Sequence, residues 1–315
     1  MKGEGVAKQK QKAGVVSIKR GWRHSWQLYV LLLPALVWLA VFMYGPMYGL
    51  LIAFKDYKAA EGIMGSRWAG MKYFKQFFST NIAKQVITNT LVLSLQQLVF
   101  SFPIPIIFAL MINQLKQGKF RKIVQTISYA PYFVSAVVIV SIMQVILAPG
   151  TGFVNILIQN MGSRPVMFMS RPEYFRPLYI VSGIWQTMGF NAIIYIAALA
   201  GISPDYYEAA IMDGASKLKR ILYIDIPLIL PTIIIMLILA VGQLMTIGYE
   251  KAYLMQAGSN LATSEIISTY VYKSGLLKAQ YSFATAVGLF NSVVNFILLA
   301  VTNFVAKKST DISLF

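Results

Sequence analysis

The sequence predicts an all-α, polytopic membrane protein with about six transmembrane helices. Hydrophobic residues make up 57% of the 315 positions and charged residues only 12%, roughly half the charged fraction of a typical soluble domain. The mean hydropathy is +0.63. Apolar runs of about 20 residues, the length that crosses a bilayer core, recur along the chain. The predicted spans are residues 28–54, 86–113, 122–147, 178–201, 227–248 and 282–305.

The region before the first span, residues 1–27, is predicted to be a basic cytoplasmic tail, with Glu4 as its one acid. Its composition resembles the start of a signal peptide. However, the apolar stretch that follows is too long for a signal peptide, and no small-residue cleavage pattern follows it. We therefore expect a retained first span, a transmembrane permease domain over residues 28–305 and a cytoplasmic C-terminal tail over 306–315.

Proline occurs inside several predicted spans. Membrane helices tolerate it because neighbouring groups satisfy the freed carbonyls. Kinks are expected at "FPIPI" (102–106) and "APYF" (130–133).

Orientation follows from the positions of lysine and arginine, which favour the cytoplasmic side. The linker "QLKQGKFRK" (114–122) has four basic residues and no acid. It indicates that this linker, the segment 203–227 and both termini are cytoplasmic, in a multi-pass protein of the cell membrane. The first outside loop is also basic, but long translocated loops follow this rule weakly.

Several kinds of chemistry are excluded by composition. The chain has no cysteine, and its one histidine, His24, lies in the basic tail, so no zinc site, multi-histidine metal site or Ser-His-Asp triad is expected. No ionisable residue lies in the middle of a span, whereas proton-coupled carriers and intramembrane enzymes need such groups. A sodium-driven carrier stays open, since backbone carbonyls can bind sodium. The net charge of +17 is spread over termini and loops, which favours contact with anionic lipid over binding of nucleic acid.

The segment "PDYYEAAIMDGASKLKRILYIDIP" (204–227) holds four of the eleven acidic residues. Ser203 and Pro204 are typical of a helix start, and Asp205 in the first turn suits the helix dipole. Gly214 is predicted to turn the chain before a second, basic helical turn. We therefore predict a helix-turn-helix at the cytoplasmic surface. Asp213 and Asp225 are given no role beyond surface solvation.

Two interpretations of this segment are open from the pattern alone. One is an amphipathic helix in the membrane interface. The other is a contact with another protein, favoured because the helix begins with acids rather than basic residues and has the small residues Ala209 and Ala210 on one face.

The segment resembles the EAA loop of ABC-importer permeases, whose pattern is E-A-A, three residues, G, nine residues, I-x-L-P. The matching positions here are Glu208-Ala209-Ala210, Gly214 and Ile224-Asp225-Ile226-Pro227, with Ile226 in place of leucine. The resemblance implies a coupling helix that docks in a groove of an ATP-binding subunit. It implies that Glu208 pairs with a basic group there and that Gly214 allows the bend. The predicted ATPase-coupling residues are Glu208, Ala209, Ala210, Asp213, Gly214, Ala215, Ile224 and Pro227.

The resemblance covers most of the chain. The stretches "LLLPALVWLAVFMYGPMYGLLIAFKDY" and "RWAGMKYFKQFF" are similar to the start of carbohydrate-uptake permeases, above all the branch for polysaccharide-derived oligosaccharides. The family implies a type I ABC-importer permease core, a second homologous permease subunit, two ABC ATPase subunits and an extracytoplasmic solute-binding protein. ATP and Mg would be bound by the partner ATPases, because this chain has no G-x-x-x-x-G-K-[ST] motif.

Sugars are bound by aromatic faces together with amide and hydroxyl groups, and the fourth span offers both in "GIWQTMGFNAIIY". Similarity to the larger maltose permease implies sugar contacts at Gln186, Thr187 and Phe190, and at Ala240 and Gln243 in the next span. Ala240 has no side-chain donor, so the substrate need not be the same. The full candidate set is Trp185, Gln186, Thr187, Phe190, Asn191, Ala240, Gln243, Asn291 and Asn295. The alternative for each polar member is hydrogen bonding between helices.

The predicted function is that of the permease subunit of an ATP-driven ABC importer, forming half the pathway for a carbohydrate and in particular an oligosaccharide. Three alternatives are an ion-coupled secondary transporter, an ABC permease for a non-sugar solute, and a membrane scaffold. Co-purification with an ATPase separates the importer from the ion-coupled carrier.

Overall fold

The computed structural model describes residues 18–310, with side chains from Trp26 onward. Residues 1–17 of the predicted N-terminal tail and 311–315 of the predicted C-terminal tail lie outside the described residues. The chain divides into two compact units, residues 1–51 and 52–315, and each is described by itself.

The first unit is helical throughout its described part and apolar from Trp26 onward. It contains α1 (Ile18–Trp38), the π-helical turn η1 (Leu39–Tyr44) and the start of η2 (Gly45–Phe54), a 3-10 helix that runs into the second unit. Residues 26–48 are all exposed, and Trp26–Phe54 is long and apolar enough to cross a membrane. A helix that is apolar all round suits a lipid environment, which confirms the first predicted span.

The second unit is built on four further membrane-length helical segments. α4 (Asn81–Ser101) and α5 (Pro103–Asn113) meet at Phe102 and form one span of 33 residues. The other three are α9 (Pro172–Ala200), the segment Lys217–Gly242 that ends in α12 (Ile226–Gly242), and α16 (Tyr281–Thr310).

Short elements connect these spans, and within residues 18–310 one small sheet lies among them. In it Lys55 pairs with Trp68 in antiparallel register. The short elements are β1 (Lys55–Asp56), α2 (Gly62–Gly65), β2 (Arg67–Trp68), α3 (Lys72–Phe78), α8 (Phe153–Asn160), α13 (Tyr249–Leu254), α14 (Leu261–Ser264), α15 (Ile267–Tyr272) and η5 (Lys273–Leu277).

The predicted third span, 122–147, is not one straight helix. It consists of α6 (Lys119–Tyr129), the 3-10 turn η3 (Ala130–Phe133) and α7 (Ala136–Ile146), with a bend of 99° between the two parts. The kink expected at "APYF" is confirmed. Pro131 cannot donate a backbone hydrogen bond, and Ser135 starts a new helix by accepting from the backbone N–H of Val138 at 3.4 Å. The described residues therefore contain five membrane-length helices, or six if this bent pair counts as one.

The predicted fifth span also differs at its end. α12 stops at Gly242, and residues 243–248 are not helical. This short irregular segment contributes residues to the candidate site.

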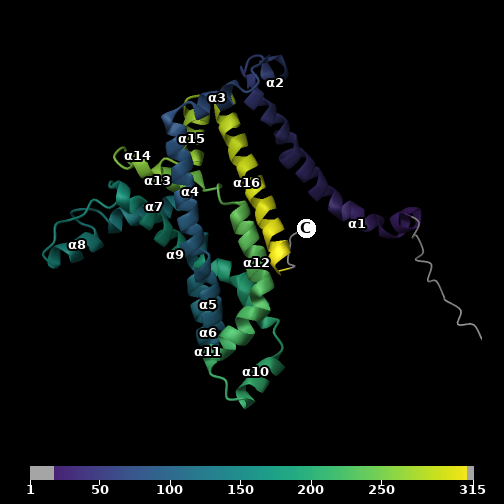
Figure 1. Cartoon of the computed structure of the whole chain (residues 1–315), viewed down its shortest axis with the longest axis vertical. Coiled ribbons are helices and arrows are strands. Elements are labelled where there is room, and N and C mark those ends of the chain that lie inside the picture. Colours follow the sequence, from purple (N-terminus) through teal and green to yellow (C-terminus); the bar gives the residue numbers. More distant parts are fainter. Residues whose placement is uncertain (1–17, 311–315) are drawn as a thin grey trace, which may run out of the picture. The chain divides into compact units, whose positions relative to one another are not determined.

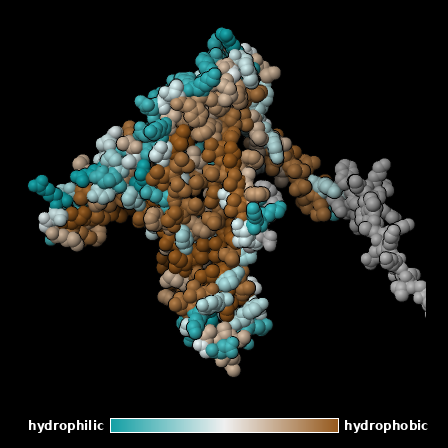
Figure 2. Space-filling view, in the orientation of Figure 1, coloured by the Kyte–Doolittle hydropathy of each residue, from teal (hydrophilic) through white to brown (hydrophobic). Residues whose placement is uncertain are grey.

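Three apolar clusters hold the second unit together. One joins α5, α9 and α12 around Ala109, Tyr195 and Ile229. A second packs Phe77 of α3 against Phe283 of α16, and a third surrounds α9 further toward its N-terminus. The visible face over α4, α5, α12 and α16 is apolar (Figure 2), with hydrophilic residues gathered toward the ends.

Within the second unit the predicted coupling loop and the helices α3 and α15 lie at opposite ends (Figure 1). The helix α10 (Pro204–Met212), followed by α11 (Lys217–Arg220), occupies one end. The helices α3 and α15 lie at the other end. This separation places the predicted coupling loop at one end of the apolar face.

Candidate transport cavity and coupling surface

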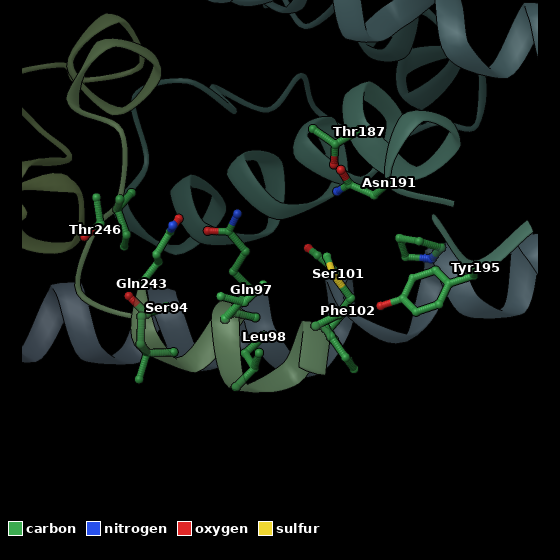
Figure 3. Close-up of a pocket in the computed structure, with 16 residues that line it drawn as sticks. Ser94, Gln97, Leu98, Ser101, Phe102, Thr187, Asn191, Tyr195, Gln243 and Thr246 are labelled. Atoms are coloured by element: carbon green, nitrogen blue, oxygen red, sulfur yellow. The ribbon is translucent and has the colours of Figure 1, made fainter. Parts of the chain in front are cut away.

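A cavity of about 510 Å³ lies between α4, α5, α9 and α12. Figure 3 shows several of its polar side chains, with the amides of Gln97 and Gln243 pointing toward the side where Thr187 and Asn191 lie. The residues that line it are Ser94, Gln97, Leu98, Ser101, Phe102, Pro105, Thr187, Asn191, Tyr195, Met236, Leu239, Ala240, Gln243, Leu244, Thr246 and Ile247. None of these side chains is charged, so the cavity offers neutral donors and acceptors beside aromatic and aliphatic surface.

One polar wall of the cavity belongs to α4 and was not predicted. Ser94, Gln97 and Ser101 line it, and because they lie three and four residues apart they share one face of the helix. The hydroxyl oxygen of Ser94 is buried and makes no hydrogen bond with any residue that the structure describes. The sequence signal was a polar stripe at positions i, i+3 and i+7 beside the apolar residues of the second half of α4.

A second wall comes from α9, where Thr187, Asn191 and Tyr195 follow one another at four-residue spacing. Side chains four apart share a helix face, so all three reach the same space. The hydroxyl of Thr187 donates to the carbonyl of Gly183 at 2.9 Å, which leaves its oxygen free to accept a further hydrogen bond.

The third wall is formed by the end of α12 and the irregular segment after it, with Ala240, Gln243 and Thr246 in the lining. Two asparagines of α16 hold this segment. Asn295 accepts from the backbone N–H of Met245 at 2.9 Å and donates to the hydroxyl of Thr246 at 2.8 Å, and Asn291 donates to the carbonyl of Met245 at 3.2 Å. Backbone groups freed from a helix in apolar surroundings need such partners.

The structure therefore brings together four predicted pathway residues: Thr187, Asn191, Ala240 and Gln243. Asn291 and Asn295 support the cavity wall without belonging to its lining. The other three predicted residues have neighbours in η3, in α7 and at Val134.

These three are Trp185, Gln186 and Phe190. Trp185 borders a separate apolar groove between α7 and α9. Gln186 donates to the carbonyl of Val134 at 2.9 Å. The ring of Phe190 stacks on Tyr132, with centroids 3.7 Å apart and an angle of 6° between the planes.

The coupling segment folds as the sequence predicts. Ser203 accepts from the backbone N–H of Asp205 at 3.4 Å, and Pro204 is the first residue of α10. The helix ends in a turn at Gly214, whose φ is +72°. There the N–H of Ala215 donates to the carbonyl of Ala210 at 2.8 Å and that of Gly214 to Ile211 at 3.0 Å. This bonding pattern satisfies the last carbonyls of a helix and favours glycine at the left-handed position.

Most predicted coupling residues lie on the surface. Glu208, Ala209, Asp213, Gly214 and Pro227 are exposed, whereas Ala210, Ala215 and Ile224 are half-buried. Large apolar side chains are exposed beside them, including Ile211, Met212 and Leu218. A cluster of exposed apolar residues at a polar end of a molecule is typical of a protein contact.

Asp225 does not lie on the surface, so the expectation that it is solvated is wrong. Its side chain is fully buried. It accepts from the hydroxyl of Tyr207 at 2.5 Å and from the amide of Gln114 at 3.2 Å. Gln114 lies 111 residues away in the chain, so the local pattern could not reveal this partner.

Tyr207 stays protonated under ordinary conditions. Burial, and secondly the hydrogen bond to Asp225, raise the pKa of Tyr207 to about 12. The hydroxyl is therefore a donor to the carboxylate at neutral pH. Among the side chains that the structure describes, residues 26–310, no three His, Cys, Asp or Glu gather into a group that could hold a metal ion.

The structure is a bundle of membrane-length helices around a neutral, polar-lined cavity, with an exposed helix-turn-helix at one end, as is typical of a multi-pass membrane permease. Residues 101–311 match the family described as "Binding-protein-dependent transport system inner membrane component". This match spans well over half of the chain, and the chain belongs to that family. The ion-coupled secondary carrier considered from the sequence is thereby less well supported than the ABC permease.

Curated relatives from Bacillus subtilis (strain 168) match nearly the whole chain. Protein LplB is 42% identical over 93% of this chain and 92% of its own length. The "Polygalacturonan/rhamnogalacturonan transport system permease protein YteP" is 41% identical over 89% of this chain and 88% of its own length.

Solved structures support the same fold. A chain of a bacterial ABC transporter "involved in the import of the acidic polysaccharide alginate" is 39% identical, with a TM-score of 0.85 over 93% of this chain and 99% of that one. A chain of a bacterial alginate ABC transporter in complex with "alginate pentasaccharide-bound periplasmic protein" is 38% identical, with a TM-score of 0.86 over 94% of this chain and 99% of that one. The type I ABC-importer permease fold predicted from the sequence is confirmed.

Proposed function

We propose that this chain is one permease subunit of an ATP-driven ABC importer and forms half the pathway for an oligosaccharide. The observation that carries the proposal is the 510 Å³ cavity, whose lining combines hydroxyl and amide groups with aromatic surface. Sugars present hydroxyl groups around apolar ring faces, so they suit such a lining. The names of the relatives support the substrate class, since YteP is named for polygalacturonan and rhamnogalacturonan transport and the solved transporter imports the acidic polysaccharide alginate.

The direct sugar contacts are proposed at Thr187, Asn191 and Gln243. Ala240, whose side chain is a single methyl group, would let the sugar approach closely. Gln97 and Ser101 of α4 add further polar groups to the lining. All six residues line the one cavity. Asn291 and Asn295 act through the wall that they hold.

The energy would come from partner subunits. Two ABC ATPases would bind ATP and Mg, and this chain would contribute no cofactor site of its own. The exposed surface of α10, with Glu208 at its centre, would dock on one ATPase. A second, homologous permease would complete the pathway, and an extracytoplasmic binding protein would deliver the sugar, as the family description of a binding-protein-dependent system suggests.

The proposed orientation places both termini and α10 on the cytoplasmic side of the cell membrane. The basic residues Lys217, Lys219 and Arg220 follow α10 directly, in agreement with the preference of basic residues for that side.

The test uses the full complex, with both permeases and the ATPases, reconstituted in proteoliposomes together with the binding protein. ATP hydrolysis and uptake of a labelled oligosaccharide are measured together. We expect the sugar-loaded binding protein to stimulate hydrolysis and to drive uptake that stops without ATP. Sugar uptake that depends on an ion gradient and is unaffected by ATP would contradict the proposal.

The cavity is tested by Gln97→Leu, which removes one amide from the lining. We expect uptake at limiting sugar to fall by about tenfold, the size of one lost hydrogen bond to the substrate. The matched control is Gln76→Leu on α3, the same change at an exposed position outside the cavity, which should leave uptake unchanged. Equal sugar uptake by the two variants would contradict the assignment of this cavity to the sugar pathway.

A further inference from the structure

The buried carboxylate of Asp225 lies where three parts of the second unit meet. Asp225 ends the π-helical turn η4 (Ile221–Asp225), directly before α12. Its partner Tyr207 belongs to α10, and its partner Gln114 caps the C-terminal end of α5. π-Helical turns inside longer helices occur frequently at functional sites.

The contact is satisfied by neutral donors. The hydroxyl of Tyr207 donates to one carboxylate oxygen at 2.5 Å, and the amide of Gln114 donates to the other at 3.2 Å. Asn113 adds a longer contact, donating to the hydroxyl of Tyr207 at 3.5 Å. None of the ion pairs found among residues 26–310 includes Asp225. A fully buried carboxylate held by a few directed hydrogen bonds fixes the positions of its donors, because leaving it unpaired is unfavourable.

This contact is the main polar attachment of α10. Within the described part of the chain, Tyr207 makes the only side-chain hydrogen bonds from α10 to another element. The helix has no fully buried residue. A movement of α10 is therefore transmitted through Tyr207 more directly than through any packed apolar face of that helix.

The two spans on the other side of the contact lead to two walls of the cavity. Asp225 directly precedes α12, which carries Ala240 and is followed by Gln243. Gln114 ends α5, which is continuous with α4 and its cavity residues Gln97 and Ser101. One phenol–carboxylate pair thus connects the coupling helix to both walls.

We propose that Asp225 is a positioning residue that fastens α10 to α5 and α12, so that a displacement of α10 moves both cavity walls together. The proposal rests on the proposed function of α10 as the ATPase docking helix. Glu208 would make the contact with the ATPase, and Asp225 and Tyr207 would pass the displacement on to the spans.

The experiment measures sugar taken up per ATP hydrolysed by the full complex in proteoliposomes. The variants are Asp225→Ala, Tyr207→Phe and the double variant. Each single change should lower this ratio by about tenfold, the size expected for one lost hydrogen bond to a charged group. The double variant should be no worse than Asp225→Ala alone, because both changes break the same contact. Asp225→Asn, which keeps an acceptor oxygen for Tyr207, should restore part of the ratio.

The matched control is Tyr281→Phe, which removes the same hydroxyl from an exposed residue at the start of α16, outside the coupling segment, and should keep the ratio of the unchanged complex. A merely structural contact would lower uptake and hydrolysis in proportion and leave the ratio as it was, which would overturn the proposal. Tyr207→Phe is a mild change, so it tests the proposal even if Asp225→Ala does not assemble. A complex of unchanged sequence that takes up no sugar would instead overturn the proposed function.

Discussion

Gly189 of α9 lies against the main chain of Ser128 in α6, so closely that a β-carbon on Gly189 would overlap the Ser128 carbonyl. Backbone cannot move aside as a flexible side chain can. The only residue type that fits is therefore glycine, and this contact sets how near α6 comes to the cavity helix α9.

We expect Gly189→Ala to destabilise the complex by about 1–3 kcal/mol, the range for overpacking a close contact. Thermal unfolding of the purified complex measures it. Gly288→Ala on α16 is the control, since a β-carbon there meets nothing within 4 Å. It should be neutral or stabilising by up to about 1 kcal/mol, because alanine is the better helix former. A Gly189→Ala complex as stable as the control would contradict the close approach.

The turn after α10 depends on the positive φ of Gly214, +72°. We expect Gly214→Ala to strain this turn by about 1–2 kcal/mol and to lower ATP-driven uptake by changing how α10 is presented. Gly214→Asn should retain much more uptake, because asparagine adopts the left-handed conformation at lower cost. Uptake assays on the reconstituted complex compare the two, and equal loss in both would argue against a backbone cause.

The cavity wall formed by residues 243–248 should lose its structure when Asn295 is replaced. Asn295→Leu removes an acceptor from the Met245 N–H and a donor to Thr246, leaving a backbone group without its partner at a cost of about 1–3 kcal/mol. Both the melting temperature and the uptake should fall. The control is Ser292→Ala, whose exposed hydroxyl donates only to Gly288 of its own helix at 3.1 Å and whose loss should change neither.

Lys251 of α13 should make stability depend on pH. Its ammonium donates to the carbonyl of Tyr179 at 3.0 Å and lies over the Tyr179 ring, yet burial lowers the pKa of Lys251 to about 8 from 10.5. Between these two values the folded protein binds fewer protons than the unfolded chain, so stability rises with pH in that window.

From pH 7.5 to 9.5 this lysine should add about 2 kcal/mol of stability. The measurement is the difference in thermal unfolding between the complex and its Lys251→Met variant at the two pH values. The variant should be the more stable of the two at pH 7.5, and the difference should shrink at pH 9.5. A pH response that is the same in both would show that Lys251 does not titrate in this window.

Local patterns predicted the parts of the fold that depend on neighbours in sequence. Apolar length indicated the spans, Ser203 and Pro204 indicated the start of α10, and Gly214 indicated its turn, because each of these signals acts within a few residues. The break at Pro131 was also visible, but its size was not. A bend of 99° reflects how α6 and α7 pack against other elements, which no local pattern contains.

Partners distant in the chain could not be predicted in the same way. Asp225 resembles a solvated surface acid until Tyr207 and Gln114 are known to face it. Phe190 has an aromatic ring of the kind that stacks on sugars, but the ring of Tyr132 already stacks on it. Thr187 and Gln243 were predicted as candidates, whereas Gln97 was missed because α4 is remote in sequence from both.

The asparagine support of residues 243–248 has a consequence for how the protein is made. The N–H of Met245 receives its acceptor from a residue 50 positions later. When the irregular segment leaves the ribosome, that acceptor has not yet been synthesised, and an unpaired amide is unfavourable in lipid. The cavity is therefore completed in the last stage of biogenesis, and nascent chains that stop before Asn295 should be targets of membrane quality control.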